Sequence, residues 1–181
     1  MTAATTELER PKPSGMPAAR GHNGLHALAL LRILLGITFL WAFLDKTFGL
    51  GFATPPEKSW LSGTSPAGGY LGSLEGPLAE AFRPLMGQPW VDWTFMLGLM
   101  LLGCALVLGV ALRGAAVGGS LLLGLLWLTS LPLRNNPVID EHVIYAVALW
   151  ALATARSGKV CGLLWRSWAR LTTKRRFRWL R

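Results

Sequence analysis

The chain has 181 residues, of which 52% are hydrophobic and 15% are charged. This composition is too apolar for an ordinary soluble domain, and the chain is too short to hold more than one membrane domain. Its two cysteines, Cys104 and Cys161, are far apart in the sequence and give neither a disulfide framework nor a metal-ligand spacing. We therefore expect an integral membrane protein with two free thiols.

The N-terminal part of the sequence predicts a tail followed by a helix. Residues 1–21 are polar and rich in Thr, Pro, Gly and Arg, which is typical of a disordered tail, here on the cytoplasmic side. A first membrane helix is predicted over about residues 25–48. It contains Arg32 and has Asp45 and Lys46 near its end. Only 12 uncharged residues separate Arg32 from Asp45, so the apolar core of this helix is short.

A long connection follows the first helix. Residues 49–91 are punctuated by prolines and glycines, which predicts a long extracytoplasmic loop. Within it, residues 78–86 predict a short helix lying on the membrane surface. A loop of this length inside a compact bundle is usually functional, often as a lid.

Two long apolar runs predict the second and third membrane helices. Trp93 to Leu112 and Gly114 to Leu133 are each 20 residues long, and only Arg113 separates them. A run of about 18 or more apolar residues can cross a bilayer as a helix. We expect helices over about 91–112 and 114–132, joined as a tight antiparallel hairpin. Pairs of small residues four apart favour close helix packing: Gly114 and Gly118, Ala115 and Gly119, Ser120 and Gly124.

The fourth predicted helix covers about residues 138–155 and completes a four-helix membrane domain that spans residues 22–156. Its uncharged core, residues 143–155, is also short. From residue 156 onwards the chain carries nine Lys or Arg and no acid. Leu and Trp alternate with these cations, so residues 157–181 predict a basic amphipathic cytoplasmic tail lying on anionic lipid.

The distribution of positive charge predicts the orientation of the chain. Four spans place both termini on one side, and Lys and Arg are concentrated in the two tails and at Arg113. The positive-inside rule then places both termini in the cytoplasm of a multi-pass protein of the plasma or inner membrane. A net charge of +9 is also typical of nucleic-acid binding. However, the basic tail directly follows a membrane helix, so we expect lipid contact and no nucleic-acid partner.

The polar residues of the two short helices fall at the same, non-cytoplasmic end. The first helix offers Asp45 and Lys46, and the fourth offers Asp140, Glu141 and His142. A charged side chain costs about 2.5–3.5 kcal/mol at the centre of a membrane helix, so such residues persist when they are paired or line a cavity. We therefore expect the two helices to be neighbours, with one polar cluster beneath the long loop. Lys46 is then the natural partner of Asp140 or Glu141.

Two interpretations of His142 stay open. Histidine next to carboxylates can pass a proton near neutral pH, as quinone or thiol redox chemistry requires. The same residues also suit the start of a helix, where Asp140 and Glu141 in the first turn complement the helix dipole.

Arg32 and the two N-terminal histidines have alternatives of their own. Arg32 either extends its side chain to the headgroups or forms a buried structural pair or a site for an anionic headgroup. His22 and His26 share a helix face, but no third ligand lies nearby, so we interpret them as interfacial residues rather than as a metal site. His142 has no histidine on its own side to share a haem. We expect no haem, flavin or metal site.

Four segments carry a resemblance to a known family. They are RILLGITFLWAFLDK at residues 32–46, WLSGTSP at 60–66, VDWTFMLGLMLLG at 91–103 with the later Arg113, and NPVIDEHVIY at 136–145. In this order they resemble the opening helix, a loop motif, the second helix and the start of the fourth helix of the DoxX/DoxD proteins. The likeness covers about residues 28–156. Position 43 departs from it, with Phe where the family pattern has a small residue.

The resemblance implies a function and a set of site residues. It implies a four-helix membrane bundle that acts as the membrane subunit of a thiosulfate:quinone oxidoreductase (thiosulfate dehydrogenase, quinone type). Electrons would pass from thiosulfate to quinone, a diffusible acceptor in the membrane. The expected catalytic residues are His142, Asp140, Lys46 and Asp45. The expected substrate-binding residues are Arg32, Asp92, Asn136 and Glu141. No DoxA-like domain is fused in this sequence, so we expect a separate redox subunit.

Two further functions compete with this one. The chain could be a non-catalytic membrane anchor or assembly subunit of a respiratory or redox-stress complex, with its basic tail docking a cytoplasmic partner. A small transporter is disfavoured, because four spans lack the inverted repeat typical of such proteins. The sequence alone leaves open whether the protein is an enzyme.

Overall fold

The computed structural model describes residues 19–75, 78–133, 136–155 and 157–159, together with residues 162, 168 and 170. The predicted N-terminal tail and most of the predicted basic tail lie outside these residues. Within the described part every regular element is helical and no strand is present. Its longest helices are α1 (Ala19–Phe48), α4 (Pro89–Leu108), α5 (Leu112–Thr129) and α6 (Glu141–Thr154). The shorter elements are α2 (Gly68–Gly72), α3 (Ala79–Phe82) and 3-10 turns at Pro56–Lys58, Trp60–Ser62, Arg83–Leu85 and Ser157–Lys159.

Helix length and surface chemistry indicate a membrane protein. Among the described residues, three helices are long and apolar enough to cross a membrane: Gly24–Phe48 within α1, α4 and α5. At 14 residues, α6 is apolar but shorter. Large exposed apolar side chains recur every three or four residues along the three long helices, as they do on a lipid-facing surface. They include Leu30, Leu34, Ile37, Trp41 and Leu44 on α1, Trp93, Leu97 and Leu101 on α4, and Val117, Leu121 and Leu125 on α5.

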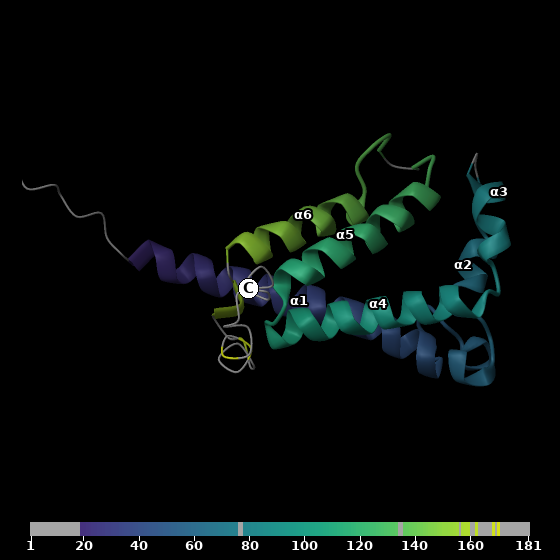
Figure 1. Ribbon diagram of the computed structural model, residues 1–181, viewed down its shortest axis with the longest axis horizontal. Helices are drawn as coiled ribbons and strands as arrows, with labels where there is room; N and C mark the ends of the chain where they lie inside the picture. Colours follow the sequence, from purple (N-terminus) through teal and green to yellow (C-terminus); the bar gives the residue numbers. More distant parts are fainter. Residues whose placement is uncertain are drawn as a thin grey trace, which may run out of the picture.

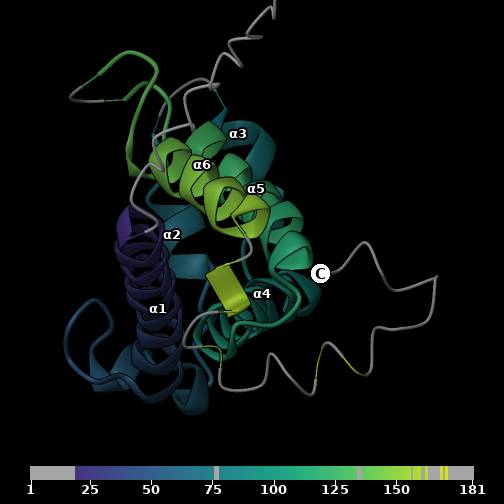
Figure 2. The same ribbon diagram turned by 90° about the vertical axis from the view of Figure 1, so that its left-hand side faces the viewer.

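The helices pack as two antiparallel pairs. α1 lies along α4 and α5 lies along α6, while contacts between α4 and α5 join the pairs (Figures 1 and 2). Core residues near the α4–α5 turn are completely or almost completely buried, including Leu106, Leu112, Leu149 and Leu152. Toward the opposite end, α5 and α6 rise away from α1 and α4 (Figure 1). The molecule is therefore closed at one end and splayed at the end that carries the long connection.

Two glycines set the distance between α1 and α4. A Cβ added to Gly103 would lie 2.6 Å from Leu40 Cγ and 3.0 Å from Gly36 O, and one added to Gly36 would lie 2.8 Å from Val107 Cγ2. Contacts this short do not occur for real side chains, so the two backbones approach as closely as they do only because both positions lack a side chain.

One of the three predicted small-residue pairs mediates packing. A Cβ on Gly119 would lie 2.5 Å from Leu149 Cδ1, and Ala115 on the same face is 8% exposed. By contrast, a Cβ on Gly118 or Gly124 would have no neighbour within 4 Å. Of the three pairs, only Ala115 and Gly119 therefore show close packing at both positions, whereas Ser120 of the third pair accepts a hydrogen bond from Trp150 Nε1 of α6 at 3.1 Å.

The turn between α4 and α5 lies earlier than predicted. α4 ends at Leu108, and Gly109 follows with φ 73°, a left-handed conformation that favours glycine. The amide of Val110 donates to Ala105 O at 3.0 Å, which closes the helix end. Arg113 was predicted to form the turn itself, but it lies in the first turn of α5. Hydrophobicity alone could not place this boundary, because the turn residues are as apolar as the helices.

The connection between α1 and α4 is built from short helical pieces. The predicted helix over 78–86 is present as α3 followed directly by the 3-10 turn at Arg83–Leu85. Two polar anchors fix the segment. Asp45 accepts from the amides of Phe52 and Ala53 at 3.3 and 3.1 Å, and Asp92 accepts from the amide of Ala67 at 3.0 Å.

Candidate functional site

The start of α6 positions a histidine and an aspartate side by side. Asp140 is the N-cap residue, and its Oδ1 accepts from the amides of His142 and Val143 at 3.0 and 3.3 Å. Aspartate is among the best N-cap residues because it satisfies amides that lack a partner within the helix. Just upstream, Asn136 Oδ1 accepts from the amides of Val138 and Ile139. This turn delays the helix to Glu141, three residues later than the predicted start at residue 138.

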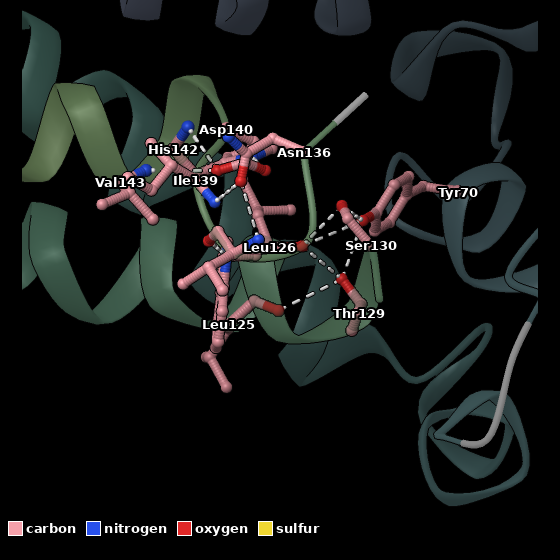
Figure 3. Close-up of polar contacts among 12 residues, drawn as sticks. Tyr70, Leu125, Leu126, Thr129, Ser130, Asn136, Ile139, Asp140, His142 and Val143 are labelled. Atoms are coloured by element: carbon pink, nitrogen blue, oxygen red, sulfur yellow. Dashed lines mark hydrogen bonds and ion pairs between the residues drawn. The ribbon is translucent and has the colours of Figure 1, made fainter. Parts of the chain in front are cut away.

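The second oxygen of Asp140 contacts the imidazole of His142. Asp140 Oδ2 and His142 Nδ1 are 2.7 Å apart, and their side chains are 12% and 20% exposed (Figure 3). Burial by itself raises the pKa of the Asp140 carboxyl. The hydrogen bonds from His142 and Val143 and the charge of His142 outweigh it and leave this pKa below 3.8. The carboxylate is therefore ionised at neutral pH and holds one ring nitrogen of His142.

Removing this carboxylate should destabilise the protein in a pH-dependent way. Asp140→Ala should lower the free energy of unfolding by about 1 kcal/mol at pH 7, the usual cost of a lost N-cap. Because the folded-state pKa is depressed, the stabilisation is complete above pH 3.8 and is lost as the pH falls through the folded-state pKa. The gap between wild type and variant, measured by denaturation in detergent, should shrink below pH 3.8. Asp140→Asn keeps an N-cap acceptor and should lose less, whereas a gap independent of pH would contradict this account.

A cluster of hydroxyl groups lies across from the His142–Asp140 dyad. Tyr70, from α2, has its hydroxyl 2.7 Å from Thr129 Oγ1 and 3.3 Å from Ser130 Oγ, both at the C-terminal end of α5. The same hydroxyl lies 3.4 Å from the carbonyl oxygen of Leu126 (Figure 3). These contacts fix α2 against the end of α5.

The dyad and the hydroxyl cluster line one open cavity of ≈ 960 Å³, which we call the dyad cavity. Four of the predicted site residues contribute to it: Asn136, Asp140, Glu141 and His142. Sequence reasoning missed Tyr70, Thr129 and Ser130. The available signal was weak: Tyr70 is one of only two tyrosines in the chain, and Thr129–Ser130 is a hydroxyl pair that ends an apolar run.

A second, smaller cavity adjoins the first. It encloses ≈ 210 Å³ between α2, α3, α4 and α5, and its walls are almost entirely apolar, including Phe82, Trp90 and Leu126. We call it the apolar slot. Tyr70 and Thr129 line both cavities, so their hydrogen-bonded side chains lie where the dyad cavity, of mixed polarity, meets the apolar slot. A cavity with polar groups next to an almost entirely apolar one suits an amphipathic ligand.

The structure separates Asp45 and Lys46 from this site. Lys46 Nζ lies 5.9 Å from the centre of the Phe95 ring, and Asp45 binds backbone amides of the loop that follows α1. The predicted ion pair between Lys46 and Asp140 or Glu141 is not formed among the described residues, so that prediction was wrong. The reason is the splayed end: α1 packs on α4 there, while α6 packs on α5.

Arg32 occupies the closed end and is completely buried. Its guanidinium donates to the carbonyl oxygens of Leu106 and, at 3.2 Å, Val107, which belong to the last turn of α4. Of the predicted alternatives, the structure shows a buried structural contact rather than a side chain extended to the headgroups. Helix C-termini leave carbonyls without partners, and a cation there also complements the helix dipole.

The remaining predictions concern Asp92, the two N-terminal histidines and metal binding. Asp92 is buried and lines a third cavity that contains none of the other predicted site residues. The side chain of His22 lies outside the described residues, and His26 is exposed near the start of α1. In the part of the chain that the structure describes, no group of three or more His, Cys, Asp or Glu could hold a metal ion.

Comparison with known proteins adds no assignment. No family model, no curated protein and no solved structure matches the chain.

Proposed function

We propose that the protein is the membrane subunit of a quinone-linked oxidoreductase of the thiosulfate:quinone type and passes electrons to membrane quinone. The observation that carries this proposal is the His142–Asp140 dyad, which lines a cavity large enough for a small ring and lies next to an apolar slot. The resemblance of the start of α6 to the DoxD proteins supports the same function.

The chemistry of quinone reduction fits this arrangement. A quinone takes up two electrons and two protons, and each proton forms an O–H bond on a ring oxygen. His142 has its Nδ1 held by the ionised Asp140, so Nε2 is the nitrogen free to exchange a proton with a ligand in the dyad cavity. The hydroxyl groups of Tyr70 and Thr129 are placed to hydrogen-bond a ring oxygen. On this proposal a separate redox subunit delivers the electrons from thiosulfate.

The proposed architecture is a four-helix membrane bundle with a long extracytoplasmic loop between α1 and α4. The α6 helix spans about 21 Å at 1.5 Å per residue, which is short for a bilayer core of about 30 Å. It nevertheless presents exposed Ile144, Val147 and Trp150, a lipid-facing surface like those of the longer helices. Both termini then face the cytoplasm of the plasma or inner membrane, and the basic tail contacts anionic lipid.

The proposal is tested with the full-length protein isolated from its native membranes with any subunit that accompanies it. Thiosulfate-dependent reduction of decylubiquinone, followed by the loss of quinone absorbance, is the expected result. Quinone binding to the purified chain in lipid nanodiscs should be detectable without thiosulfate. Absence of both binding and turnover would contradict the proposal.

A second function is favoured by one observation. Asp140 caps α6 through Oδ1, so the dyad also has a purely structural explanation at the start of a helix. On this account the protein is a non-catalytic anchor or assembly subunit of a respiratory or redox-stress complex. It would then retain a partner complex during purification but fail to bind quinone.

A further inference from the structure

A buried carboxylate without a counter-ion lies at the start of α4. Asp92 is 7% exposed, and its Oδ1 accepts from Ser65 Oγ at 2.7 Å and from the amide of Ala67 at 3.0 Å. Its other oxygen, Oδ2, has no hydrogen-bond partner among the described residues, and none of their cations is within ion-pair distance. Oδ2 is not among the fully buried polar atoms that lack a partner, so it is open to the adjoining cavity and can accept a contact from a bound cation.

Two indole rings form part of the wall around this carboxylate, together with hydroxyl side chains and backbone. Asp92 lines a cavity of ≈ 260 Å³ together with Trp60 and Trp93, which we call the indole cavity. The two indole rings meet edge to face, with centroids 4.7 Å apart and planes inclined by 74°. Tryptophan is the best aromatic partner for a cation, and rings combined with a carboxylate are the usual means of binding alkylammonium groups.

The composition of the indole cavity favours a cation over other ligand classes. An anion would be repelled by Asp92, whose charge also offsets the positive N-terminal end of α4. A divalent metal prefers several charged oxygen ligands, whereas this cavity offers one carboxylate and the hydroxyls of Thr64 and Ser65, of which Ser65 already donates to Asp92. A soft, weakly hydrated cation remains.

We propose that the indole cavity binds an alkylammonium group beside the contacting rings of Trp60 and Trp93 and against the free oxygen of Asp92. The cavity lies at the N-terminal end of a helix long enough to span the membrane, where lipid headgroups are found. The ammonium headgroup of a zwitterionic phospholipid and a free alkylammonium solute share this chemistry. The site is separate from the dyad cavity and does not depend on the quinone proposal.

The first experiment titrates tetramethylammonium chloride into the purified full-length protein in detergent, with sodium chloride at equal ionic strength as the control. Binding is measured by saturation-transfer NMR on the methyl protons. Trp93→Leu should weaken binding about five- to tenfold, consistent with loss of a cation–π contact. Trp90→Leu is the matched control, because Trp90 is equally exposed at 60% against 56% but does not line the cavity. It should leave binding unchanged.

The second experiment identifies the source of the ammonium group. Native mass spectrometry compares retention of phosphatidylcholine with that of phosphatidylglycerol, which has no ammonium group. Preferential retention of phosphatidylcholine, lost in Trp93→Leu, supports a lipid ligand. Tetramethylammonium binding without lipid preference supports a free solute. No tetramethylammonium binding by the wild type, or equal binding by wild type and Trp93→Leu, would overturn the proposal. Asp92→Asn should also weaken binding, but Asp92 anchors the loop, so Trp93→Leu is the deciding variant.

Discussion

Replacing His142 with alanine should lower thiosulfate-dependent quinone turnover by about 10²- to 10⁴-fold, the usual contribution of a positioned proton donor. Among the described residues that line the dyad cavity, His142 is the only histidine, and its ring is held by the ionised carboxylate of Asp140. The fold should survive, because the cap of α6 is made by Asp140 to backbone amides that alanine retains. Turnover is measured with decylubiquinone, and folding by circular dichroism and thermal denaturation in detergent.

The matched control is His26→Ala, which removes an exposed imidazole from the other end of the molecule. It should leave turnover unchanged. If His142→Ala retains wild-type turnover with an intact fold, His142 is not a proton relay. The non-catalytic anchor function is then the better supported of the two proposed functions. If quinone binding is also unaffected, the dyad cavity is not the quinone site.

Replacing Gly103 with alanine should lower the free energy of unfolding by about 1–3 kcal/mol, the usual cost of overpacking a close contact. The new methyl group would lie 2.6 Å from Leu40 Cγ and 2.9 Å from Leu40 N, and backbone cannot move aside without separating α1 from α4. Denaturation in mild detergent, followed by helical circular dichroism, measures the loss.

Gly118→Ala provides the control with the opposite sign. No atom lies within 4 Å of the added methyl group, and alanine is preferred over glycine in a helix interior by about 1 kcal/mol. This variant should therefore be as stable as the wild type or slightly more stable. Destabilisation of both variants to the same extent would show that the α1–α4 contact is looser than described.

Much of the helical framework could be predicted, because a long uncharged apolar run is compatible with few structures other than a membrane helix. The second and third predicted helices, about 91–112 and 114–132, correspond to α4 and α5 with shifts of two to four residues at their ends. The errors concern helix ends that are determined by backbone conformation and side-chain hydrogen bonds rather than by hydrophobicity. Gly109 ends α4 through a left-handed conformation inside an apolar run, and Asn136 and Asp140 delay α6 through their side-chain hydrogen bonds.

The candidate site was predictable only in part. Asp140 and His142 are two residues apart, so their contact follows from local helix geometry. Tyr70 and Thr129 are 59 positions apart, and nothing in either segment encodes their pairing. Lys46 shows the converse error: it lies at the same depth as Asp140 in the predicted helices but not near it, because the helix pairs diverge at that end. A hydropathy pattern predicts the depth of a residue along the membrane normal. It does not predict which helices are neighbours, because that depends on tertiary packing.

The division into a closed end and a splayed end has a consequence for how the chain tolerates change. Leu106, Leu149 and Leu152, with the guanidinium of Arg32, fill the closed end, whereas His142, Tyr70 and Thr129 belong to the other. Residues that share no partners and lie far apart contribute to stability additively. The changes in stability caused by substitutions in the cavities should therefore add to those caused by substitutions in the core at the closed end. Ligand preference can drift at one end of the molecule while the other keeps the chain folded.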